Sequence, residues 1–105
     1  MKFNKYKGFL KSVTNKNKRK RTAILKKATK QQLKALCEVL LNVYNLNLPI
    51  SSQQQKKLSK YKKAVLEILN RKKSWDAKRK IFEQKGGFLP ILAPTILSLL
   101  ASLAL

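Results

Sequence analysis

Histidine is absent from this chain, and cysteine and the acidic residues are scarce. The sequence has no His, a single Cys at position 37 and only four Asp and Glu residues. One cysteine cannot form an intramolecular disulfide, and no cluster of Cys and His is present to hold zinc. General acid–base catalysis needs titrating groups placed together, and four scattered acids offer no such arrangement. We therefore expect a protein that is not an enzyme and that uses no metal or cofactor.

Basic residues dominate the charge. Lys and Arg number 25, which gives a formal net charge of +21 at pH 7. A compact domain with so large an excess of one sign repels itself, and its charge is neutralised by binding a polyanion. Nucleic acid and anionic membrane surfaces are the usual partners of such proteins. The composition therefore predicts a polyanion as the main partner.

Charge and hydrophobicity are segregated along the chain. All 25 basic residues precede Gly86, and residues 88–105 carry no charged side chain. The sequence therefore predicts four parts: a disordered basic arm (1–21), a basic helical module (22–85), a Gly-Gly hinge or cleavage site (86–87) and an apolar tail helix (88–105). No alternating strand pattern is present, so the predicted fold class is all-α. Three or four short helices would form the module, and the tail would be a separate helix.

Capping residues mark the predicted helix starts. Ser or Thr followed three residues later by Gln is a capping box, and three such pairs precede helical patterns. Thr29 and Gln32 would open a helix ending near 45–47, and either of two overlapping pairs would open a helix over 53–70. A further helix would begin after Ser74 and end at Gly86, because glycine suits the left-handed residue beyond a helix end. The overlapping pairs are Ser51 with Gln54 and Ser52 with Gln55.

The helix after Thr29 has the strongest apolar face, so we expect it to be the central and most buried one. Cys37 falls on this face and is predicted to be a buried thiol. Trp75, in the last helix of the module, is expected to pack in the core rather than to stack on a base. The spacing that defines the central face is i, i+3, i+4, i+7 and i+11, at Leu33, Leu36, Cys37, Leu40 and Tyr44.

Runs of adjacent basic residues are the candidate phosphate contacts. They cannot bury a core, so they stay solvated or lie along phosphates. The run 18–21 also matches a nuclear localisation signal. The residues that we expect to bind DNA are Lys16, Lys18, Arg19, Lys20, Arg21, Lys56, Lys57, Lys60, Arg71, Lys72, Lys73, Lys78, Arg79 and Lys80.

The apolar tail leaves three destinations open. As one helix it would span about 27 Å at 1.5 Å per residue, which is marginal for a bilayer. It could insert in a membrane, pack against the basic helices or occupy a groove of a capsid protein. Residues that would meet the membrane are Phe88, Leu89, Ile91, Leu92, Ile96, Leu97, Leu99, Leu100 and Leu103.

The Gly-Gly pair has two interpretations. Glycine's freedom would allow a simple hinge after a helix. Alternatively, Gly-Gly suits cysteine proteases whose narrow substrate tunnels exclude side chains, and a cut after Gly87 would separate the charged and apolar parts. The residues of that protease site would be Gln84, Lys85, Gly86, Gly87 and Phe88.

The order of these parts resembles a known group of viral proteins. A basic region, then 84-QKGGF-88, then 89-LPILAP-94 is similar to the precursor of the adenovirus core protein called X, or mu. The helical segment from Ala28 onward resembles small basic proteins of the Polinton/Maverick and adintovirus group more closely. The chain departs from mu in being Lys-rich, with only four Arg.

The resemblance implies a minor virion core protein that helps to condense double-stranded DNA. It also implies maturation by a viral cysteine protease, and a location in the virion and the host nucleus. The alternative is a membrane-active or tail-anchored basic protein whose C-terminus inserts in a bilayer while its Lys residues bind anionic headgroups.

Overall fold

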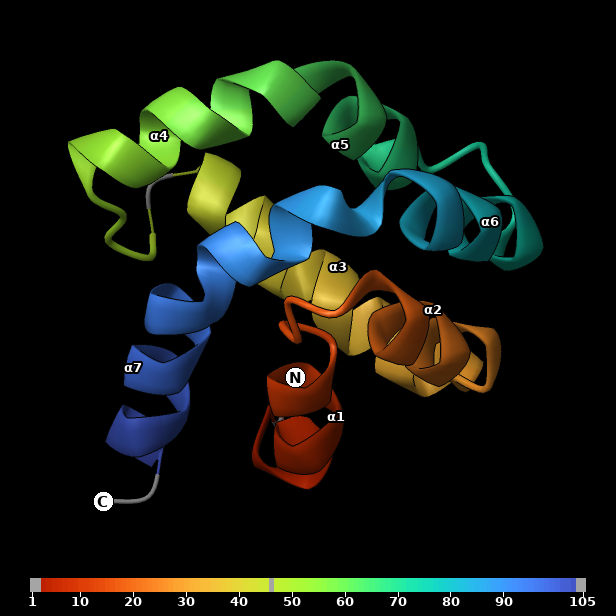
Figure 1. Cartoon of the computed structure of the whole chain (residues 1–105), viewed down its shortest axis with the longest axis horizontal. Helices are drawn as coiled ribbons and strands as arrows, with labels where there is room; N and C mark the ends of the chain where they lie inside the picture. The colour runs from red at the N-terminus through yellow and green to blue at the C-terminus, as the bar shows by residue number, and fades with distance from the viewer. Residues whose placement is uncertain (1–2, 46, 104–105) are drawn as a thin grey trace.

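The protein is all-α, as predicted, in the residues that the computed structural model describes, 3–45 and 47–103. Three of its ten elements are 3₁₀ helices (η), and helices α4 and α5 form an arch along the top of Figure 1, with α1 at the bottom. The elements are η1 (Phe3–Tyr6), α1 (Lys7–Ser12), α2 (Lys18–Lys26), α3 (Lys30–Tyr44), α4 (Ser52–Leu58), η2 (Ser59–Tyr61), α5 (Lys62–Leu69), α6 (Trp75–Lys85), η3 (Gly86–Leu92) and α7 (Ala93–Leu103).

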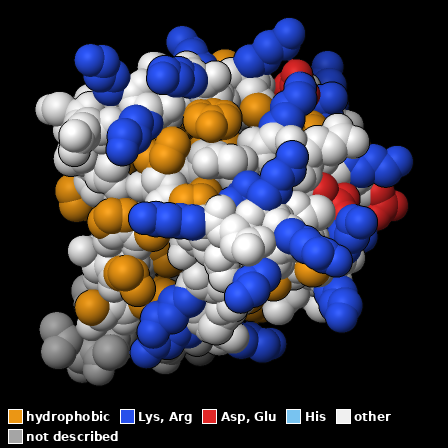
Figure 2. Space-filling model, in the orientation of Figure 1, with side chains coloured by type: hydrophobic (Ala, Val, Ile, Leu, Met, Phe, Trp, Pro, Cys, Tyr) orange, Lys and Arg blue, Asp and Glu red, His pale blue; other side chains and the backbone are white. Residues whose placement is uncertain are grey.

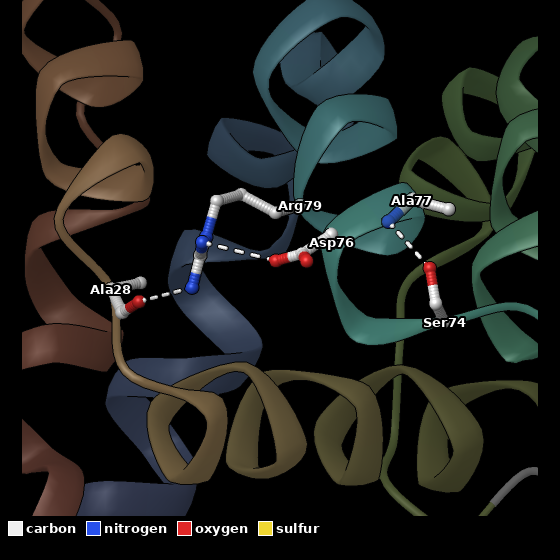
Figure 3. A network of polar contacts seen from close by, with 5 residues as sticks. All are labelled: Ala28, Ser74, Asp76, Ala77 and Arg79. Atoms are coloured by element: carbon white, nitrogen blue, oxygen red, sulfur yellow. Dashed lines mark hydrogen bonds and ion pairs between the residues drawn. The ribbon is translucent and has the colours of Figure 1, made fainter.

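The predicted caps are confirmed. Thr29 Oγ1 accepts a hydrogen bond from the Gln32 backbone N–H at 3.1 Å, and the Gln32 side chain accepts from the Thr29 N–H at 2.9 Å. Ser51 and Gln54 form the second capping box, so the chain uses this pair to open α4. Ser74 caps α6 through the Ala77 N–H at 3.1 Å (Figure 3). Each cap satisfies backbone donors that a helix start leaves unpaired, which fixes where the helix begins.

Helix α3 is the most buried, and the apolar face that the sequence predicts lies in the core. Leu33, Leu36 and Leu40 are almost completely shielded from solvent, and Cys37 is buried beside them. Trp75 is half-buried and packs against this core, as expected. The predicted helix over 53–70 is divided by the 3₁₀ turn η2 into α4 and α5.

The apolar tail is part of the core, which corrects the prediction of a separate C-terminal helix. Its buried side chains come from both η3 and α7, and α7 contacts α1 and η1 at the other end of the chain. Burying these groups against the basic helices removes them from water, which stabilises the fold by roughly 1.5–3 kcal/mol per large side chain. The five most deeply buried are Phe88, Leu89, Leu92, Ile96 and Leu100.

A polar link also holds the tail. Gln54 Nε2 donates hydrogen bonds to the Ile91 carbonyl and to Thr95 Oγ1, each at 3.0 Å. The same Gln54 side chain completes the capping box through its oxygen. Thr95 is buried, and its hydroxyl also lies 3.5 Å from the Pro49 carbonyl, to which it donates. One glutamine therefore joins the start of α4 to the tail.

The prediction of a disordered basic arm over 1–21 is met only in part. Residues 13–17 carry no helix, whereas the chain is helical over 3–12 and again from Lys18 onward. Leu10 and Val13 are fully buried, because the apolar residues that interrupt the lysines face the core. Asn17 caps α2 by accepting a hydrogen bond from the Lys20 N–H at 3.1 Å.

Candidate nucleic-acid interface

Most of the predicted DNA-binding side chains are exposed. Of the fourteen, ten are exposed and Lys73 is half-buried. The exposed ones project from α2, α4, η2, α6 and the loops before α2 and α6, so they are not confined to one helix. They are Lys16, Lys18, Arg19, Lys20, Lys56, Lys57, Lys60, Arg71, Lys72 and Lys80.

The fold brings some of these groups together from distant parts of the chain. Lys16, from the loop before α2, and Lys57, from α4, line one open groove together with residues of the 90–94 stretch. Lys18 and Arg19 line a shallow hollow along α2 with Lys26. Predicted DNA-binding side chains therefore line two separate hollows of the surface.

The charge is spread over a body of nearly equal dimensions. The principal extents are 33 × 29 × 28 Å, and Lys and Arg side chains project around much of its outline (Figure 2). Among the described residues the one ion pair joins Asp76 and Arg79 at 3.5 Å, at the surface. This pair neutralises little of the positive charge, most of which is carried by exposed side chains.

Two predicted DNA-binding residues are buried, which corrects the prediction for them. Arg21 is 6% exposed, and its Nη1 donates a hydrogen bond to the Asn15 carbonyl at 3.0 Å. Lys78 is also 6% exposed, and its Nζ lies 4.5 Å from the centre of the Trp75 ring. An ammonium held over an indole face is stabilised by the ring, so Lys78 does not face outward as expected.

Arg79 is the third predicted DNA-binding residue whose side chain is bound within the protein, and Figure 3 shows its contacts. Its Nη2 donates to the Ala28 carbonyl at 2.7 Å, across the turn between α2 and α3, while Asp76 approaches Nη1. A hydrogen bond from a charged donor to a part-buried carbonyl ties α6 to this turn. Only Lys80 of the predicted trio 78–80 is free to meet a phosphate.

Further exposed lysines lie outside the predicted DNA-binding set. That set was chosen mainly from the densest basic runs, whereas single lysines and pairs of lysines elsewhere are equally exposed. Helical periodicity was the signal that could have found them, because their positions avoid the apolar face. They are Lys11, Lys26, Lys27, Lys30, Lys62, Lys63 and Lys85.

The Gly-Gly segment is helical, which differs from both the expected hinge and an extended protease substrate. Gly86 has φ −77° and ψ 13°, so it is not the left-handed residue predicted for a helix end. The chain passes directly from α6 into η3. Gly86 and Phe88 are buried, whereas Gln84, Lys85 and Gly87 are exposed. A Cβ at Gly86 would meet Leu89 at 3.5 Å, an ordinary contact, so the fold tolerates alanine there.

The predicted membrane residues lie mainly in the core. Besides the five buried side chains, Ile91 and Leu99 pack partly against the core, and Leu97 is 52% exposed. The side chain of Leu103 lies outside the described part. Over the described residues, none of the helices combines the length and the hydropathy needed to cross a bilayer. In this fold, lipid contact by the tail would require most of these groups to leave the core.

Cys37 is an inert thiol, and this gives a simple prediction. Burial raises its pKa from 9.0 to about 11, with nearby Lys78 opposing the shift. At about pH 8 the folded protein then holds about 100-fold less thiolate than the unfolded chain, and thiolate is the reactive form. We expect iodoacetamide to label Cys37 at least about 100-fold more slowly in buffer than in denaturant, measured by mass spectrometry. Equal rates would contradict the buried position.

The described residues contain no group of three or more His, Cys, Asp or Glu side chains that could hold a metal ion. Comparison of the chain with protein-family models, with curated proteins and with solved structures finds no match.

Proposed function

We propose that this protein is a minor virion core protein that binds and condenses double-stranded DNA without sequence specificity. The observation that carries the proposal is a net charge of +21 on a compact helical body with a single ion pair in its described part. Binding would be driven by release of counterions from DNA when Lys and Arg neutralise phosphates. The order of parts resembles that of adenovirus mu and the adintovirus proteins. This resemblance supports a viral origin and a location in the virion and the host nucleus.

The spread of the basic groups supports condensation in particular. Exposed lysines lie on α4, η2 and α5 at the top of Figure 1 and on α1 at the bottom. A protein with basic groups on more than one side can contact two duplexes at once and so draw them together. A single basic face would coat one duplex without bridging it to another.

Salt dependence of binding is the first test. If about eight basic groups meet phosphates, the slope of log K against log salt is near −7, and affinity falls about 10⁴-fold between 50 and 200 mM salt. Fluorescence anisotropy with labelled duplexes of two unrelated sequences would measure this. We expect equal affinity for both sequences. A slope shallower than about −3, or a strong preference for one sequence, would overturn non-specific binding through phosphates.

Bridging is tested with a variant that weakens one side of the body. Changing Lys56, Lys57 and Lys60 to Gln removes exposed charge from α4 and η2, and should reduce the slope by at most about 2.7, at 0.9 for each lost contact. Energy transfer between two differently labelled duplexes measures bridging. We expect bridging to fall more than binding does, because one of two contact surfaces is weakened. If bridging and binding fall by the same factor, the protein has a single binding face.

We also propose that a viral cysteine protease matures the protein after Gly87. Because Gly86 and Phe88 are buried in a helical segment, cleavage would act on a chain that has not yet folded or has opened locally. A membrane-active tail is the weaker candidate, because the side chains that would enter lipid support the core.

A further inference from the structure

We propose that a cleft formed by α3, the end of α5, α6 and the loop before α6 binds an acidic peptide segment that presents one large apolar side chain. This surface is separate from the basic groups of α2 and α4, and the inference does not depend on the proposed DNA binding. The cleft has a volume of about 330 Å³, which gives room for a side chain to enter.

One part of the cleft is apolar. Leu41 is 39% exposed, although it stands on the most buried helix of the protein. Leu69 and Trp75 are half-buried beside it, and Cys37 lines the same cleft. Exposed leucines and aromatic rings gathered in a concave site are typical of protein interaction surfaces, because covering them removes apolar area from water.

The other part of the cleft is basic. Lys34, Arg71 and Lys78 line it, against one acid, Glu38. None of the three forms an ion pair within the part of the chain that is described. Lys78 Nζ lies 4.5 Å and Lys34 Nζ 6.0 Å from the centre of the Trp75 ring, so two ammonium groups flank the apolar floor. The site is therefore complementary to carboxylates placed around an apolar side chain.

An acidic peptide fits this chemistry better than nucleic acid does. A duplex presents phosphates but offers no apolar group that could cover Leu41 and Leu69. A single-stranded base would need a free face of Trp75, and Lys78 already occupies a position over that ring. Asp and Glu side chains would instead pair with Lys34 and Arg71, while a Phe or Leu between them would fill the apolar floor.

Trp75 provides the readout, because it is the only tryptophan in the chain. The probe is a short synthetic peptide of Asp and Glu with one central Phe, and the control peptide has Ala in place of Phe. We expect the Phe peptide to shift Trp75 emission and to bind at least about fivefold more tightly than the Ala peptide. Equal affinity would overturn the proposal, because it would show charge attraction alone.

Two matched pairs of variants locate the site. Leu41→Gln removes the exposed apolar group of the cleft, and Leu66→Gln changes a leucine that is 50% exposed on α5 outside it. Arg71→Gln removes a charge in the cleft, and Lys63→Gln removes an exposed charge elsewhere. We expect the cleft variants to weaken binding of the Phe peptide at least about fivefold and the controls less than twofold.

Either of two results would overturn the proposal. The first is that the members of a pair lose affinity equally. The second is that single-stranded DNA shifts Trp75 emission and displaces the peptide at a lower concentration, which would make the cleft a base-binding site. All four substitutions are at exposed positions, and circular dichroism of each variant confirms that a loss of binding is not a loss of fold.

Discussion

A chain ending at Gly87 is expected to lose its folded structure. The cut removes η3 beyond Gly87 and all of α7, and with them the five deeply buried side chains of the tail. Deleting one such side chain to alanine costs about 2–5 kcal/mol. Even at about 2 kcal/mol each, five would remove about 10 kcal/mol, which matches the whole stability of a typical domain, about 5–15 kcal/mol.

The remaining charge increases the effect. Residues 1–87 keep all 25 basic groups and all four acids, so the net charge of +21 stays on a chain with a smaller core. Repulsion between like charges then favours expanded states. The products of maturation at this site would be an extended polycation and an apolar peptide, not two folded domains.

Circular dichroism and thermal melting of residues 1–87 would measure this result. The control ends at Ala101 and so keeps Ile96 and Leu100, and it should retain cooperative unfolding. DNA neutralises the basic groups, so we expect it to restore part of the helix content of the shorter chain. Because DNA does not replace the lost core, the recovery should be incomplete. A cooperative melt of residues 1–87, with the helix content of the full chain, would show that the basic module folds without the tail.

Local signals were sufficient to predict where several helices begin and which is central. Capping residues act within one turn, so Thr29 and Ser74 could be identified directly from the sequence, and Ser51 was one of two overlapping candidates. The apolar spacing of the segment after Thr29 likewise predicts burial, because one face of a helix must be covered. These features depend on residues a few positions apart, and the structure confirms them.

The fate of the tail depends on contacts that sequence spacing does not reveal. An apolar segment must be covered, but its composition is the same whether lipid, a capsid protein or its own chain covers it. The link from Gln54 to Thr95 joins residues 41 positions apart. Gln54 was identified for its cap alone, and nothing in the sequence assigned its amide nitrogen to the tail.

Helical periodicity could have predicted that two of the basic residues are buried. Arg21 precedes buried Leu25 by four positions, and Lys78 precedes buried Phe82 by four, so each lies on the inner face of its helix. Treating 18–21 and 78–80 as uniform basic runs ignored this periodicity. The partners that make burial possible, the Asn15 carbonyl and the Trp75 ring, could be located only in three dimensions.

Neighbouring residues of α7 should differ sharply in their effect on stability. Ile96 is fully buried and Leu97 is 52% exposed, although both are aliphatic residues of one helix. We expect Ile96→Ala to lower the free energy of unfolding by about 2–5 kcal/mol, because it leaves a cavity in the core. Leu97→Ala should change it by less than about 0.5 kcal/mol, as surface substitutions do. Urea unfolding followed by circular dichroism measures both.

The same pair tests whether burial of the tail controls cleavage at Gly87. Both positions follow the proposed protease site along the chain, so neither substitution alters the residues that enter the protease. Cleavage of an opened form follows the population of that form when opening is fast, and about 1.4 kcal/mol corresponds to tenfold. An adenovirus-type cysteine protease should therefore cut Ile96→Ala more than about 12-fold faster than Leu97→Ala under native conditions. Equal rates would mean that the Gly-Gly segment opens independently of α7, and the tail would then stabilise the fold without restricting its processing.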